Sequence, residues 1–143
     1  MTQLSPNFWF DRSCGSWSSH RRYIFDMRSF KPANMVTEFT LSSLKFNKWQ
    51  VDWEGQTNGT MVLTLEGDQL HRSRDYFGEG NHSSRISMID EDTILLHTHY
   101  GGTIYREEIR LLNSDTVRLR QTFGKCDTTG KPKLIGQYYE LRV

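Results

Sequence analysis

Two segments near the C-terminus carry acidic and basic residues at alternate positions. Arg106, Glu108 and Arg110 occupy every second position of one segment, and Arg118 and Arg120 do so in the next. Successive side chains of a β-strand point to opposite faces, so each set would share a face. Guanidinium groups bind carboxylates through forked hydrogen bonds, and a carboxylate among them can accept hydrogen bonds from N–H groups. The pattern fits either a site for an anionic ligand or charges that face solvent, and alternation alone favours solvent.

These two segments are predicted to pair as neighbouring strands of a hairpin. The residues between them are of types that tolerate the dihedral angles of a tight turn. A turn centred on Ser114 places Glu108 opposite Arg120, and Arg110 then lies opposite Arg118. The prediction is a cluster of one carboxylate and three guanidinium groups on one face of the sheet.

Other catalytic patterns are incomplete. His97 and His99 have the spacing of a cupin metal site, but the glutamate that such a site needs shortly afterwards is missing, so we expect no metal. No Gly-x-Ser-x-Gly motif indicates nucleophilic catalysis. The paired glycines at 101–102 suit a hairpin turn, because no helix follows them to bind phosphate.

The chain is predicted to be rich in strands. Alanine, the best helix former, occurs once in 143 residues, whereas β-branched and aromatic residues are plentiful. Ser5 followed by Pro6 predicts a short helix at the N-terminus. Turn residues at short spacing separate ten predicted strands, near residues 17–25, 35–44, 49–54, 59–66, 69–76, 83–89, 93–100, 103–112, 116–124 and 133–142.

Short turns between successive strands imply antiparallel pairing, because parallel strands need long crossover connections. Ten strands in one small domain either close or expose edges, and closure removes the edges. The predicted fold is therefore all-β: a single antiparallel up-and-down barrel of about ten strands with a short N-terminal helix, spanning residues 1–143 as one domain. A barrel of this size can hold one small ligand, as lipocalins do.

The charge balance narrows the classes of ligand. The 18 basic and 17 acidic residues give a net charge of +1, so we expect no binding to nucleic acid or to an anionic membrane. Arginine outnumbers lysine by 12 to 6, and its planar guanidinium group suits a flat anionic ligand. The aromatic side chains of the predicted strands fit either an ordinary core or a wall that stacks on a conjugated ring system.

The cysteines and the first residues of the sequence are those expected of a cytoplasmic protein. Cys14 and Cys126 form no Cys-x-x-Cys motif, and we expect reduced thiols. The first residues lack the basic and apolar stretches of a signal peptide, and no segment has the ~18 apolar residues of a membrane span. We expect a soluble, cytoplasmic protein.

Six short motifs occur in order along the chain: Ser13-x-Gly15-x-Trp17-x-Ser19-x-Arg21, Leu70-x-Arg72-Ser73-x-x-Tyr76, Thr98-x-Tyr100, Glu107-Glu108-x-Arg110, Arg118-Leu119-Arg120 and Tyr139-Glu140-x-Arg142. Each motif is weak alone, but the set in this order is fairly specific. On these motifs the sequence resembles the S-type (CpcS/CpeS) phycobiliprotein lyases, from Phe10 to Val143.

The resemblance implies a ten-stranded barrel similar to fatty-acid-binding proteins. It implies that the protein binds a linear tetrapyrrole, phycoerythrobilin or phycocyanobilin, as a transient substrate and has no permanent cofactor. The bilin would be joined by a thioether bond to a cysteine of a phycobiliprotein subunit of the phycoerythrin or phycocyanin type. The implied partners are that apo-subunit and the free bilin or the reductase that produces it. A homodimer is left open, and in an alga the location would be the plastid stroma.

The resemblance also turns the predicted charge cluster inward. Glu108 is then expected beside the pyrrole nitrogens, where it would stabilise the electrophilic cation. The bilin-binding residues expected with it are Arg118, Arg120, Arg21, Trp17, Trp53 and Arg142. Because the acceptor thiolate is the nucleophile, Cys14 and Cys126 are expected to be dispensable. The alternative is a carrier barrel that binds a fatty acid or another apolar anion without chemistry.

Overall fold

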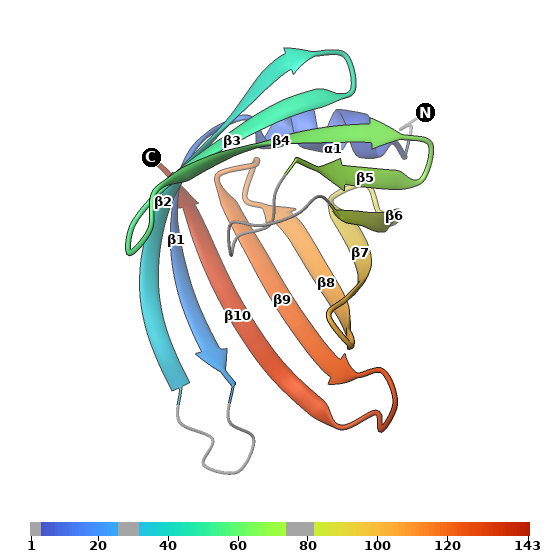
Figure 1. Cartoon of the computed structure of the whole chain (residues 1–143). Helices are drawn as coiled ribbons and strands as arrows, with labels where there is room; N and C mark the ends of the chain where they lie inside the picture. Colours follow the sequence, from blue (N-terminus) through green and yellow to red (C-terminus); the bar gives the residue numbers. More distant parts are fainter. Residues whose placement is uncertain (1–3, 26–31, 74–81) are drawn as a thin grey trace.

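The residues that the structure describes form a closed antiparallel barrel of ten strands preceded by one helix (Figure 1). The computed structural model describes residues 4–25, 32–73 and 82–143. Each strand pairs with its neighbours in sequence, and β1 closes the barrel against β10. The elements are α1 (Pro6–Ser13), β1 (Gly15–Ile24), β2 (Pro32–Lys45), β3 (Lys48–Glu54), β4 (Gly59–Glu66), β5 (Gln69–Arg72), β6 (His82–Asp90), β7 (Thr93–Tyr100), β8 (Thr103–Leu112), β9 (Val117–Cys126) and β10 (Pro132–Arg142).

The prediction of an all-β up-and-down barrel with a short N-terminal helix is confirmed. The predicted and observed strands agree in order, and their bounds differ by a few residues. Of the fifth predicted strand, β5 covers 69–72, and 74–76 lie outside the described residues. Within the described ranges, no helix is both long and apolar enough to cross a membrane.

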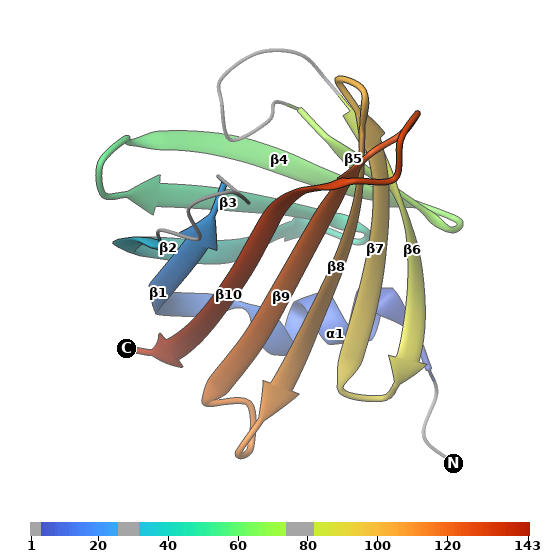
Figure 2. The same cartoon turned by 90° about the horizontal axis from the view of Figure 1, so that it is seen from below.

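Helix α1 lies across one end of the barrel (Figure 2). The indole N–H of Trp9 donates a hydrogen bond of 2.8 Å to the carbonyl oxygen of Asp92. The guanidinium group of Arg12 forms ion pairs of 2.7 Å with both Asp92 and Asp115. These two aspartates lie in the β6–β7 and β8–β9 turns, so the helix is attached to two hairpins and covers their end of the barrel.

An apolar cluster joins the helix to the strands that it covers. Phe10 of α1 packs against Trp49 of β3 with their ring centroids 4.8 Å apart. Strand β3 alternates buried and half-buried residues, as expected for a strand with one face turned to the core. The most deeply buried apolar members of the cluster are Trp9, Trp17, Trp49, Ile94, Leu70 and Leu111.

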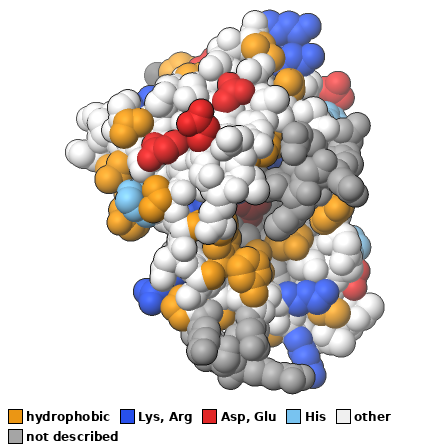
Figure 3. Space-filling view, turned by 60° about the vertical axis from the view of Figure 1, so that its left-hand side comes forward, with side chains coloured by type: hydrophobic (Ala, Val, Ile, Leu, Met, Phe, Trp, Pro, Cys, Tyr) orange, Lys and Arg blue, Asp and Glu red, His pale blue; other side chains and the backbone are white. Residues whose placement is uncertain are grey.

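On strand β9, polar side chains face the interior and apolar side chains face outward. This is the reverse of a strand that packs on an apolar core. Its buried members include Arg118, Arg120 and Thr122, whereas Leu119 and Phe123 are 42% and 41% exposed. Apolar side chains do reach the outer surface, as the orange atoms in Figure 3 show. Buried guanidinium groups are costly unless other groups pair with them, so the inner face of β9 indicates a specialised interior.

The β8–β9 turn is one residue longer than predicted. Four residues, 113–116, separate the strands, and the first three have φ between 53° and 63°. Asparagine and aspartate adopt this left-handed region more readily than most residues. Glu108 therefore pairs with Gln121, and the predicted pairing of Glu108 with Arg120 is wrong. Because a one-residue shift exchanges the two faces of a strand, β8 turns Glu107 inward and Glu108 outward.

Candidate functional site

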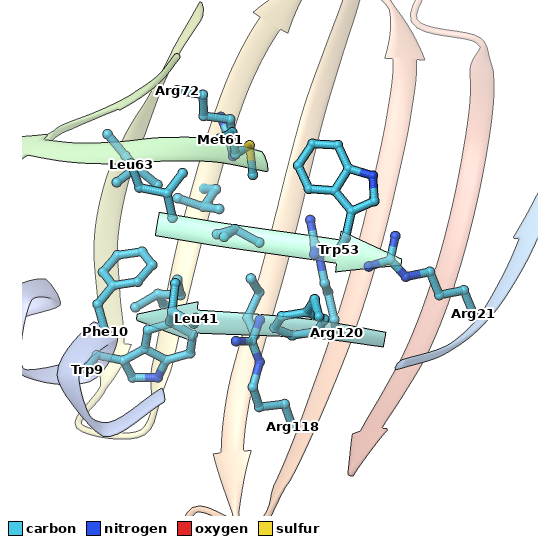
Figure 4. A pocket seen from close by; sticks show the side chains of 16 residues that line it. Trp9, Phe10, Arg21, Leu41, Trp53, Met61, Leu63, Arg72, Arg118 and Arg120 are labelled. Atoms are coloured by element: carbon cyan, nitrogen blue, oxygen red, sulfur yellow. The ribbon is translucent and has the colours of Figure 1, made fainter. Parts of the chain in front are cut away.

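A cavity opens inside the barrel, with an empty volume of about 610 Å³ counted out to its mouth. Aromatic and aliphatic side chains form most of its wall, and Arg21, Arg72, Arg118 and Arg120 complete it (Figure 4). An apolar cavity that contains several guanidinium groups suits a ligand with an apolar body and more than one negative charge.

Arg120 is paired with Glu107, the acidic residue that β8 turns inward. Its Nε donates a hydrogen bond of 3.0 Å to Glu107 Oε2, its Nη2 forms an ion pair with the same oxygen, and Thr122 Oγ1 donates to it at 3.3 Å. Burial alone would raise the pKa of Glu107, but the positive charges of Arg120 and Arg72 hold it below its usual range. The carboxylate is therefore ionised at neutral pH. The hydrogen bonds from Arg120 Nε and Thr122 Oγ1 both reach Oε2 and fix the orientation of the carboxylate.

Arg118 is fixed by a second buried carboxylate. Glu140 of β10 is fully buried, and its Oε1 lies 3.0 Å from Arg118 Nε. Burial would raise the pKa of Glu140, but the adjacent guanidinium groups lower it. The guanidinium carbon of Arg118 also lies 5.3–5.4 Å from the ring centroids of Trp9, Trp17 and Phe39, within the range of cation–π attraction. These contacts hold Arg118 in one orientation at the cavity wall.

Tyr138 of β10 connects the arginines of β9 and β1. The guanidinium carbons of Arg21 and Arg120 lie 5.2 Å and 5.1 Å from the centroid of its ring. Burial raises the pKa of the Tyr138 phenol, which therefore stays neutral. Arg21 Nε also donates a hydrogen bond of 3.0 Å to Ser19 Oγ. One wall of the cavity thus presents three arginines in arrangements set by aromatic rings and carboxylates.

Comparison with known proteins places this barrel in a family. The family model described as "CpeS-like protein" matches residues 23–143. The chain belongs to the CpeS-like family. It is 24% identical to "Putative phycocyanobilin lyase CpcS 2" of Nostoc sp., in an alignment that covers 94% of this chain and 88% of that protein.

Solved structures share the fold of this CpeS-like chain. The S-type phycobiliprotein lyase CPES of Guillardia theta is 21% identical and superimposes with a TM-score of 0.74, covering 99% of this chain and 94% of that one. A protein of unknown function from the DUF3598 family of Nostoc punctiforme is 14% identical with a TM-score of 0.69. That match covers 94% of this chain and 49% of the other. Both likenesses concern the fold alone.

Glu108 of this CpeS-like protein lies outside the cavity. Its carboxylate is 3.9 Å from the guanidinium groups of Arg106 and Arg110, all on the outer face of β8. Arg110 pairs with Leu119 rather than with Arg118, so the second predicted facing pair is also wrong. The buried carboxylate beside the β9 arginines belongs to the preceding residue in the sequence.

The other predicted site residues divide into two groups. Arg21 and Trp53, like Arg118 and Arg120, line the cavity, and their role toward a ligand stays a prediction. Arg142 lies elsewhere: it donates hydrogen bonds to three backbone carbonyl oxygens, those of residues 12, 14 and 115. Its guanidinium carbon lies 4.4 Å from the ring centroid of the fully buried Trp17, which does not line the cavity. Arg142 and Trp17 therefore join α1 to the barrel.

Sequence reasoning missed three charged residues of the interior: Glu107, Glu140 and Arg72. Glu140, which pairs with Arg118, stands in the last of the six family motifs. Glu107 was passed over because the turn length was underestimated by one residue. Arg72, on the short strand β5, stands in one of the six family motifs, which was the available signal. Its segment contains too few residues for alternation to predict which face is buried.

Proposed function

We propose that this protein is a phycobiliprotein lyase, which binds a phycobilin in the barrel cavity and delivers it to a cysteine of a phycobiliprotein subunit. The observation that supports this most directly is the cavity itself: four arginines set among aromatic and aliphatic side chains, one of which, Arg120, is paired with the ionised Glu107. A bilin has the complementary groups, namely two propionates, four pyrrole nitrogens and a conjugated surface. Membership of the CpeS-like family and the name of the Nostoc relative point to the same activity.

Glu107 is the residue to which we assign the contact with the pyrrole nitrogens. A carboxylate has two oxygens that can each accept more than one hydrogen bond, so Glu107 can accept from pyrrole N–H groups while its Oε2 stays bound to Arg120. An ionised carboxylate next to the bilin favours the protonated, cationic form of the tetrapyrrole, because opposite charges close together stabilise each other. That form is the stronger electrophile. This role replaces the one predicted for Glu108.

The attachment needs no nucleophile from the lyase. The sulfur of the acceptor cysteine bonds to the ethylidene or vinyl carbon of ring A, the carbon–carbon π bond opens, and the thiol proton ends on the bilin. Nothing leaves, and no oxidant or reductant is consumed. The protein contributes by holding the bilin in one geometry and by stabilising its positive charge during the addition. Cys14 and Cys126 are absent from the cavity lining, as this role requires.

The test is chromophore transfer to an apo-subunit in the presence of phycocyanobilin or phycoerythrobilin. We expect bilin absorbance that stays with the subunit after denaturation, formed faster than by bilin and subunit alone. A subunit whose acceptor cysteine is replaced by serine is the control, and it should stay colourless. A transfer rate equal to the spontaneous rate would contradict the proposal. If the protein binds a fatty acid but no bilin, it is instead a carrier barrel.

A further inference from the structure

Arg72 is a buried cation on the side of the cavity away from the other three arginines (Figure 4). It is 7% exposed. Its Nη1 donates a hydrogen bond to Ser84 Oγ, and Ser84 Oγ is hydrogen-bonded to Thr98 Oγ1. Both hydroxyl residues are buried, and they come from β6 and β7. A guanidinium group and two hydroxyl groups thus form a polar site in an otherwise apolar wall.

This arginine differs from its two buried counterparts, because no carboxylate of the described residues forms an ion pair with it. Arg118 is paired with Glu140, and Arg120 with Glu107. Within residues 4–25, 32–73 and 82–143, no carboxylate oxygen lies within 4.0 Å of an Arg72 nitrogen, although the charge of Arg72 is close enough to lower the pKa of Glu107. Removing a guanidinium group from water is unfavourable unless an anion pairs with it. The hydroxyl contact does not offset that cost, and within the described part of the chain the charge of Arg72 has no carboxylate in direct contact with it.

The N–H donors of Arg72 that no described residue occupies define what this site would bind. A guanidinium group has five N–H donors in a planar fork, and Ser84 occupies one of them. The remaining donors suit the two oxygens of a carboxylate, in the bidentate geometry that arginine prefers. Ser84 and Thr98 hold the fork in place, because their hydroxyl groups are hydrogen-bonded to each other as well.

We propose that Arg72, supported by Ser84 and Thr98, is a binding site for one carboxylate of the ligand, and that the arginines of the opposite wall bind a second. This inference rests on the proposed function and adds to it: of the two propionates of a bilin, each is bound at a different wall. Two separated carboxylate sites select a dicarboxylate over an acid with one carboxylate. They also fix which way round the tetrapyrrole enters the barrel.

The test compares phycocyanobilin with its dimethyl ester in wild-type protein and in Arg72→Met. Quenching of tryptophan fluorescence gives the dissociation constants. Losing a hydrogen-bonded carboxylate contact should raise the Kd for the diacid by about 10- to 100-fold. The ester has no charged carboxylate to lose, so its Kd should change much less. Arg85→Met is the matched control, because Arg85 is the exposed neighbour of Ser84 and should leave both constants unchanged.

Thermal unfolding of the apo-protein separates this role from a structural one. Replacing a buried cation that no described carboxylate contacts by an apolar side chain should leave the Tm of Arg72→Met equal to that of the wild type or raise it. The inference is overturned if the variant binds the diacid as tightly as the wild type, if it loses diacid and ester equally, or if its Tm falls markedly.

A failure of the proposed function would look different. Wild-type protein would then bind neither the diacid nor the ester. In that event a fluorescent long-chain fatty acid replaces the bilin as the probe, and Arg72→Met should weaken its binding by the same 10- to 100-fold. Unchanged fatty-acid affinity in the variant would overturn the Arg72 site.

Discussion

Exchanging Glu107 and then Glu108 for glutamine tests which of these adjacent acids lies inside the barrel. Glu107→Gln removes the carboxylate that forms an ion pair with Arg120, and Arg120 is 7% exposed. Removing one partner of a buried ion pair typically lowers the free energy of unfolding by about 3–5 kcal/mol. Because glutamine keeps one hydrogen bond, we expect a loss of about 3 kcal/mol. At this chain length that corresponds to a fall in Tm of about 9 °C.

Glu108→Gln should behave as a surface substitution. Its ion pairs with Arg106 and Arg110 are 3.9 Å long, and those two arginines are half exposed. Exposed pairs of this kind contribute less than about 1 kcal/mol. Urea unfolding followed by tryptophan fluorescence, with thermal scans alongside, measures both variants under one condition. Equal losses in the two variants, or a larger loss in Glu108→Gln, would refute the inward orientation of Glu107.

The same pair of variants predicts a pH dependence. The folded-state pKa of Glu107 lies below its ordinary value of 4.5, so the unfolded chain takes up the proton first as the pH falls. The stabilisation due to Glu107 is therefore complete above roughly pH 5.5 and is lost as the pH falls through the folded-state pKa. We expect the stability gap between wild type and Glu107→Gln to narrow in acid. A gap that widens in acid would contradict the sign of the shift.

Three further outcomes are expected. Arg12→Ala removes the ion pairs between α1 and two turns, and it should lower the free energy of unfolding, measured in urea, by about 2 kcal/mol. An unchanged free energy of unfolding would show that the apolar face of the helix alone holds it in place. Gly59→Ala should lower the free energy of unfolding by about 2 kcal/mol, because an added Cβ would lie 2.3 Å from the Trp53 ring. An unchanged Tm would show that the indole ring can move aside. Cys126, whose pKa is lowered to about 6 by hydrogen bonds from neighbouring threonines, should react with iodoacetamide half-maximally near pH 6 and well before Cys14, without loss of bilin binding.

The architecture could be predicted from local signals. The scarcity of alanine, the closely spaced turns and the Ser5-Pro6 pair were enough for the barrel and its helix, because each is a property of a few adjacent residues. Alternation also correctly placed Arg118 and Arg120 on one face.

The orientation of those faces could not be obtained from alternation. A cavity reverses the usual rule, so arginines of β9 face inward while Leu119 is 42% exposed. The assignment on β8 depended on a single residue of turn length, and nothing in Asn-Ser-Asp-Thr reveals that three successive residues adopt positive φ. Arg142 was misplaced for a different reason: its partners include backbone carbonyl oxygens of α1 and of the β8–β9 turn, and these leave no trace in side-chain patterns.

The central claim is that a bilin binds in this cavity next to an ionised carboxylate that keeps it protonated. The most direct measurement is a pH titration of the visible absorption of phycocyanobilin, bound to wild-type protein, bound to Glu107→Gln and free in solution. We predict that the bound chromophore keeps the red-shifted spectrum of the protonated form to a pH at least about one unit above that of free bilin, and that Glu107→Gln removes most of that difference. A spectrum that titrates with the pKa of free bilin, or a shift that Glu107→Gln leaves intact, would contradict the account.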